Sequence, residues 1–172
     1  AMVLDYLQTT DSQDENLLAS ATDLLDRGYK RLTTFETPQK GYEWFGKAPA
    51  HEGLTAFGLM QFTDMKRVGG NVDPEMINRT AKWIMSTKDG KGGFTRNTKA
   101  LHNFGSISED IMNGYIVYAL ADAGYTNIKR EAVASFNTAI QTNDPYQLAM
   151  SASAMYDLRD EGKANQALKA LL

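Results

Sequence analysis

The sequence contains no cysteine, and this absence excludes several kinds of chemistry. A chain without thiols forms no disulfide, offers no thiolate to a metal and has no cysteine nucleophile. Histidine is scarce too, with two residues in 172, so a structural or catalytic zinc site is not expected. The glycine-rich stretch at residues 90–93 lacks the spacing of a phosphate-binding loop. We therefore expect neither a metal nor a cofactor.

Long apolar runs and long basic runs are also absent. The apolar stretches are far shorter than the roughly 20 residues that a membrane-spanning helix needs, so no membrane span is expected. The formal net charge is −3 and no basic patch is visible, which argues against nucleic acid as a partner. No signal peptide opens the chain. The Ala1-Met2 start is consistent with a cloning junction, and targeting signals would then lie elsewhere.

What is present is an ordinary globular composition. Hydrophobic residues make up 42% of the 172 residues and charged residues 23%. A chain of this size typically buries about 70% of its unfolded surface, enough for a substantial core. We expect residues 1–172 to form a single domain.

Two kinds of helical pattern alternate along the chain. Segments around residues 17–32, 77–85 and 128–140 carry one apolar stripe with charges between its members, typical of a helix that buries one face. Segments around residues 54–62, 111–121 and 146–158 are apolar nearly all round, typical of a helix covered on all sides. The alternation predicts helical hairpins stacked in two layers, and no segment shows the period of a strand.

Residues that start and stop helices agree with this pattern. The predicted starts are the capping box Ser12–Glu15, the pairs Asp73-Pro74 and Asp144-Pro145, and Ser108. The predicted stops are Gly69-Gly70, Gly124 and Gly162.

A weak internal repeat indicates how the hairpins are arranged. Gly41–Gly46 precedes the first all-apolar helix and Gly92–Phe94 precedes the second, about 50 residues later. A glycine-rich turn with an aromatic plug before each inner helix is typical of α/α-toroids, whereas solenoid repeats of the TPR or HEAT type have other periods. The predicted fold is all-α, an incomplete α/α-toroid.

Several short blocks occur in a fixed order along the chain. They are Val3–Leu7, Gly28–Leu32, Gly41–Gly46, Leu54–Phe57, Ala81–Ile84, Lys91–Phe94 and Ser108–Leu120. In order and spacing they resemble the thioester domain (TED) of the alpha-2-macroglobulin and complement family. After about Tyr125 only the helix pattern agrees. The resemblance implies an α/α-toroid, a reactive Cys–Gln thioester and a role in trapping proteases or tagging targets.

The sequence departs from that family in three ways. The thioester-bearing Gly-Cys-Gly-Glu-Gln motif would lie just before Met2 and is not in this chain. The family domain is longer, which leaves closure of the ring open. The family's tryptophan before the Leu54–Phe57 block is replaced by Glu52-Gly53.

His102 is the candidate site residue that the resemblance implies. In complement-like relatives a histidine at this place attacks the thioester, and the released thiolate activates a hydroxyl acceptor. In many protease-trapping relatives an asparagine stands there and amines react instead. The adjacent Asn103 is therefore the alternative, since a shift of one residue exchanges the two. A neutral imidazole is a suitable nucleophile. The competing interpretation is a histidine in a loop without a chemical role.

Other candidate residues favour structural roles. His51 lacks the second histidine of an H-E-x-x-H zinc pattern, because Thr55 stands there, and it is expected at a helix start. Glu109 and Asp110 are adjacent on one helix, point about 100° apart, and are expected to cap it rather than act as an acid/base pair. The remaining candidates are the aromatic residues Tyr42, Trp44, Phe45 and Phe94, expected as core plugs, and Asp157, Asp160 and Glu161, expected in a solvated turn.

The resemblance implies that the chain is part of an extracellular alpha-macroglobulin-like endopeptidase inhibitor, periplasmic or on the cell surface in a bacterium. It would not be an enzyme. Its partners would be proteases or target surfaces, together with other domains of its own chain. Two alternatives stay open. One is an α/α-toroid carbohydrate-active enzyme, which needs two carboxylates about 5–9.5 Å apart. The other is a non-catalytic helical scaffold with an exposed apolar patch.

Overall fold

The computed structural model describes residues 1–97 and 107–172. The regular secondary structure in this part of the chain consists of α-helices joined by loops. Two isolated bridges are the β-type pairings among the described residues. The prediction of an all-α fold is confirmed. The helices are α1 (Met2–Thr9), α2 (Glu15–Thr33), α3 (Glu52–Arg67), α4 (Pro74–Ser86), α5 (Glu109–Asp122), α6 (Lys129–Thr142), α7 (Pro145–Asp157) and α8 (Glu161–Leu171).

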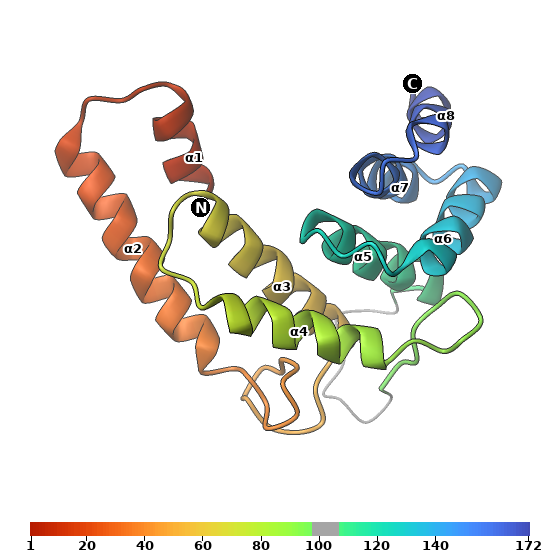
Figure 1. Cartoon of the computed structure of the whole chain (residues 1–172), viewed down its shortest axis with the longest axis horizontal. Helices are drawn as coiled ribbons and strands as arrows, with labels where there is room; N and C mark the ends of the chain where they lie inside the picture. Colours follow the sequence, from red (N-terminus) through yellow and green to blue (C-terminus); the bar gives the residue numbers. More distant parts are fainter. Residues whose placement is uncertain (98–106) are drawn as a thin grey trace.

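The helices form two layers, as the alternating patterns predict. Helices α3, α5 and α7 pack side by side, and each also packs against the outer helix that follows it, α4, α6 or α8 (Figure 1). The inner helices are covered on several sides, so their pattern is apolar nearly all round. The large side chains that the fold buries completely include Leu59, Phe62, Ile116, Val117, Leu120, Leu148 and Met155, all on inner helices.

The layers follow an open arc. Figure 1 shows α1 and α2 on one side, α3 and α4 in the middle, and α5 to α8 on the other side. The two-layered helical arrangement is observed, and the incomplete α/α-toroid stays a prediction. Within the described residues, no helix is long and apolar enough to cross a bilayer.

Helix α2 is covered less than its sequence predicts. Of its apolar stripe only Leu25 is buried, while Leu17 and Leu24 are exposed. The reason lies in its neighbours: α2 packs against α1 and the side of α3, and no outer helix lies on its other flank. Helix α1 is tied to the core by buried Leu4 and Leu7.

Most of the predicted helix starts are confirmed. Asp73, Asp144 and Ser108 each accept a hydrogen bond from a first-turn backbone N–H of the helix that follows. At α2 the prediction was wrong by two residues. Asp14, not Ser12, accepts from the Leu17 N–H at 2.9 Å, because α2 begins at Glu15 and the residue just before it supplies the cap.

The predicted helix stops are confirmed in two places and wrong in one. Gly69 and Gly124 follow their helices with positive φ, the backbone conformation that favours glycine after a helix end. Gly162, by contrast, lies inside the first turn of α8. There Arg159 takes the left-handed conformation and Asp160 caps α8. Asp160 is thus a capping residue rather than part of a solvated turn.

The two long connections from an outer to an inner helix, from α2 to α3 and from α4 to α5, repeat one backbone design. In the first, Glu36 pairs with Tyr42, and in the second, 52 positions later, Lys88 pairs with Phe94. The flanking backbone hydrogen bonds recur at the same offset: Thr37 N to Gly41 O with Glu43 N to Phe35 O, then Asp89 N to Gly93 O with Thr95 N to Thr87 O. The internal repeat predicted from the sequence is confirmed, and it includes the hydrogen bonds.

Each of these loops is also held to the next outer helix by an ion pair, and the charges are reversed between the two copies. Glu36 pairs with Arg79 of α4, and Lys88 pairs with Glu131 of α6. Both residues of the second ion pair lie 52 positions after those of the first. The acidic residue is in the loop in the first pair and in the outer helix in the second. Opposite charges thus connect each loop to its own outer helix and disfavour exchange between copies.

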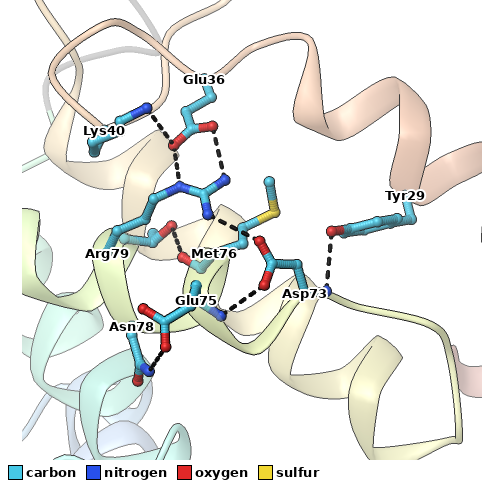
Figure 2. Close-up of polar contacts among 9 residues, drawn as sticks. Tyr29, Glu36, Lys40, Asp73, Glu75, Met76, Asn78 and Arg79 are labelled. Atoms are coloured by element: carbon cyan, nitrogen blue, oxygen red, sulfur yellow. Dashed lines mark hydrogen bonds and ion pairs between the residues drawn. The ribbon is translucent and has the colours of Figure 1, made fainter.

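The first of these ion pairs belongs to a larger polar cluster (Figure 2). The Arg79 guanidinium donates to both carboxylate oxygens of Glu36, at 2.6 and 3.0 Å, and reaches Asp73 at 3.1 Å. The Tyr29 hydroxyl accepts from the Asp73 N–H at 3.1 Å, which links α2 to the start of α4. Two parallel bonds fix the orientation as well as the distance of the pair.

We predict that the Glu36–Arg79 pair contributes measurably to stability. Glu36→Gln and Arg79→Gln, alone and combined, form a double-mutant cycle in urea unfolding. The coupling energy should be about 1–2 kcal/mol, because the side chains are 14% and 29% exposed and the geometry is bidentate. As a control, the exposed pair Asp23–Arg27 should couple by about 0.3–0.5 kcal/mol. Equal coupling energies in the two cycles would contradict the prediction that the Glu36–Arg79 pair contributes more to stability than an exposed pair.

Candidate functional site

The candidate site lies where the two long loops lead into the inner helices. Residues 34–51 lead into α3, and the second loop begins after α4 and leads toward α5 (Figure 1). The resemblance places the chemistry in this second loop. The described residues that bring the loops together include Ala50, Glu52 and Asn97.

His51 is the cap of α3, as its sequence position predicts. Its Nδ1 atom accepts hydrogen bonds from the N–H groups of Gly53 and Leu54, at 3.1 and 3.4 Å. An accepting Nδ1 carries no proton, so the neutral ring in this geometry bears its hydrogen on Nε2. The imidazole therefore does here what a serine or aspartate does at the other helix starts.

Glu52 is a buried carboxylate in the first turn of α3, with 5% of its surface exposed. Its Oε1 accepts the backbone N–H of Asn97 at 2.5 Å. The Asn97 side chain in turn donates from Nδ2 to the carbonyl oxygen of Ala50 at 3.2 Å. Two hydrogen bonds thus tie Asn97, at the end of the second loop's described part, to the start of α3.

His102 and Asn103 lie outside the described residues. The structure describes the chain on both sides of them. Arg96 donates from Nη1 to the carbonyl oxygen of Ile107 at 3.3 Å, which joins the two flanks. Ser108 then caps α5. Hydrogen bonds therefore hold the described residues on both sides of these positions, Asn97 to Glu52 of α3 and Ile107 to Arg96.

The aromatic residues of the two loops divide into two groups. Tyr42 and Phe94 are buried plugs, as predicted, and each backbone N–H donates to an inner-helix side chain, Thr55 of α3 or Asn113 of α5. Trp44 and Phe45 are 42% and 70% exposed, so their assignment to the core was wrong. They follow Tyr42 in a tight turn that Gly46 closes at positive φ, and this turn directs them outward.

A small apolar cavity lies beside this turn. Its volume is about 150 Å³, similar to a cavity that holds one benzene ring. The residues that line it include Leu32, Phe35, Trp44, Leu54, Phe57 and Phe62. Tyr42 and Glu43 also line it, and its exposed surface is apolar, so it could accept one apolar side chain.

The acidic pair considered as a possible acid/base pair, Glu109 and Asp110, has a structural role. Glu109 and Asp110 lie in the first turn of α5, where carboxylates suit the helix dipole, as predicted. Among residues 1–97 and 107–172 no cluster of His, Cys, Asp and Glu is arranged to hold a metal ion.

A cluster of acidic residues lies near the C-terminal ends of the inner helices, away from the two long loops. Arg67 of α3 pairs with Asp64 at 2.8 Å and with Asp122 of α5 at 2.9 Å. Asp157 of α7 is close enough for Asp122 to raise its pKa, although burial is the larger cause. Asp122 and Asp157 line a surface hollow together with Tyr118 and Tyr156. Ion pairing with Arg67 occupies the carboxylates of α3 and α5.

Glu52 and Asn97, which join the two loops of the candidate site, were not singled out by sequence reasoning. Their contact spans 45 residues, and no local pattern predicts it. The one available signal was the replacement of the family's tryptophan by Glu52-Gly53. A Cβ atom on Gly53 would lie 2.9 Å from Cε of Met112 on α5, so a larger residue there would require the end of this flexible side chain to shift.

The fold and its loops define a two-layered domain of helical hairpins with a loop-built site at the start of its inner helices. Residues 1–172 match the A-macroglobulin TED domain. The chain belongs to this family.

Similar proteins agree with that assignment. Thioester-containing protein 1 allele S1 of Anopheles gambiae is 25% identical over 165 residues, covering 90% of this chain and 12% of that protein. Allele R1 is 24% identical over 166 residues, with the same coverage. In structure, the chain is similar to native alpha-2-macroglobulin from Escherichia coli, spanning domain MG7 to the C-terminus. The TM-score is 0.63 at 13% identity, covering 90% of this chain and 24% of that one.

The chain thus spans about an eighth of the length of these thioester-containing relatives. It corresponds to one part of much larger proteins.

We predict that Asp157→Asn stabilises the domain at neutral pH. Burial and Asp122 raise the pKa of Asp157, against the opposing effects of Arg67 and Arg159. A raised carboxyl pKa means that the folded state favours the proton, so stability is lost as pH rises through that pKa. The variant and the parent should unfold at equal urea concentrations near pH 3, and the variant should be the more stable at pH 7. A variant less stable at pH 7 would contradict the pKa direction.

Proposed function

We propose that this chain, residues 1–172, is a single domain and part of the thioester domain of a larger alpha-macroglobulin-like protein. That protein would inhibit endopeptidases by entrapment, and this domain would attach the target covalently. The observation that carries the proposal is the family match over the whole chain. The loops support it, because hydrogen bonds hold the described residues on both sides of the segment with His102, Asn97 to Glu52 and Ile107 to Arg96.

The proposed chemistry transfers an acyl group from a Cys–Gln thioester to the target. A ring nitrogen of His102 bonds to the thioester carbonyl carbon, and the carbon–sulfur bond breaks to release the cysteine thiolate. The thiolate then takes the proton of a target hydroxyl. The hydroxyl oxygen bonds to the acyl carbon, and the imidazole leaves. The net reaction converts a thioester and an alcohol into an ester and a thiol.

In this role the domain reacts once with its target and does not turn over, so it is not an enzyme. It needs no metal and no cofactor. Its partners are a protease or a target surface, and the other domains of its own chain. Such a protein meets its targets outside the cell, or in the periplasm or on the cell surface of a bacterium.

The proposal predicts the acceptor preference of the full-length protein. A Gly-Cys-x-Glu-Gln sequence should precede this chain, and the protein should incorporate labelled glycerol and labelled methylamine. His102→Ala should lower the ratio of glycerol to methylamine incorporated by about 100-fold, because the imidazole pathway is lost. Mass spectrometry of the labelled peptide measures this ratio.

Asn103→Ala is the matched control and should leave the ratio unchanged. If Asn103→Ala alters the ratio and His102→Ala does not, Asn103 occupies the acceptor-determining position. Absence of the cysteine before this chain would overturn the covalent mechanism. Incubation with a protease adds a direct test, because covalent entrapment gives an adduct that survives denaturation in SDS.

A further inference from the structure

The small apolar cavity beside the first long loop is lined mainly by aromatic rings. They come from the loop and from α3, and they are Phe35, Tyr42, Trp44, Phe57 and Phe62. Trp44 and Phe57 are 42% and 46% exposed, so the cavity opens to solvent beside these two side chains. An aromatic ring carries negative charge density on its face and attracts a cation there, although its contact surface is apolar.

The same cavity is bordered by a buried carboxylate. Glu43 lines it and is 3% exposed. Its Oε2 accepts the backbone N–H of Phe45 at 2.8 Å, while its Oε1 has no hydrogen-bond partner in the described part of the chain. Among residues 1–97 and 107–172, Glu43 also forms no ion pair. A buried charge costs free energy unless a counter-charge compensates it, so this carboxylate lacks a partner.

A cation already lies against one ring of this aromatic group. The guanidinium of Arg31, on α2, stands over the Phe35 ring, 5.5 Å from the ring centre. Because the exposed surface of the cavity is apolar, a cation that enters it needs an apolar surface of its own. A quaternary ammonium group has one, since methyl groups surround its charge and it has no N–H that needs an acceptor.

We propose that this cavity binds a small quaternary ammonium group. The rings contact its methyl groups, and Glu43 supplies the counter-charge. The volume of about 150 Å³ suits a group about the size of benzene. Choline belongs to this chemical class, both as a free molecule and as the headgroup of a lipid. The inference concerns binding alone, and it stands whether or not the domain transfers an acyl group.

Two probes of equal shape separate charge from size. Choline has a quaternary nitrogen where its neutral isostere, dimethylbutanol, has a carbon atom. In NMR titrations of this chain, choline should bind about tenfold more tightly than dimethylbutanol. Equal affinities, or no binding of choline, would overturn the proposal. Phosphatidylcholine vesicles then distinguish the two sources: cosedimentation that free choline abolishes indicates a lipid headgroup, and its absence indicates a free ammonium compound.

Glu43→Gln tests the counter-charge. The amide oxygen still accepts the Phe45 N–H, and the negative charge is removed. Affinity for choline should fall about tenfold, while affinity for dimethylbutanol should not change. Glu131→Gln is the matched control, because Glu131 is also a buried carboxylate, 5% exposed, and does not line the cavity. A preference for choline that survives Glu43→Gln, or that both variants lose equally, would contradict the role of Glu43.

Gly58→Ala locates the site with a variant that keeps the fold. Gly58 lines the cavity from α3, and a Cβ atom there would lie 3.4 to 3.6 Å from the Tyr42 and Phe62 rings, an ordinary contact distance. Alanine also favours a helix more than glycine does. In urea unfolding the variant should be at least as stable as the parent. It should bind both probes about tenfold more weakly, because the methyl group occupies part of the cavity. Full choline affinity in this variant would place the binding elsewhere and overturn the proposal.

Discussion

The short antiparallel bridge that closes each of the two long outer-to-inner loops, before α3 and before α5, is the constraint on which the rest of the structure depends. Glu36 forms an antiparallel bridge with Tyr42, and Lys88 forms one with Phe94. In each loop the backbone thus leaves an outer helix, turns, and runs back antiparallel to itself. This geometry lets the backbone N–H of Tyr42 donate to Thr55 of α3, and that of Phe94 to Asn113 of α5. Without the bridges, α3 and α5 would lack these fixed contacts near their starts.

The candidate site is a consequence of those bridges. The first loop delivers His51 and Glu52 to the start of α3, and the second delivers Asn97 to the same place. Ion pairs hold the two loops to different outer helices. The first loop supplies the acidic residue of its pair and the second loop supplies the basic residue. The site is thus built from backbone positions fixed independently by each loop, and the Glu52–Asn97 hydrogen bond joins them. Such a rigid base suits chemistry that depends on the placement of a single reactive group.

Local patterns were sufficient to predict the helices, their layers and the repeat, because burial on one side or on all sides leaves a periodic trace in the sequence. They failed where a longer-range contact decides the outcome. Trp44 and Phe45 are as apolar as Tyr42, and only the turn that ends at Gly46 directs them outward. The Glu52–Asn97 contact joins residues 45 positions apart, and a buried glutamate has the same sequence pattern as an exposed one. His102 and Asn103 remain predictions from the family resemblance.

Native-state hydrogen exchange tests most directly whether the two loops are rigid parts of the core. The informative amides are those of Thr37, Glu43, Asp89 and Thr95, which donate across the loops at 2.7–3.2 Å. If the bridges fix the inner helices, these amides will exchange with opening free energies close to those of α3 and α5. If they exchange as fast as exposed loop amides while α3 and α5 stay protected, the bridges do not hold the helices in place.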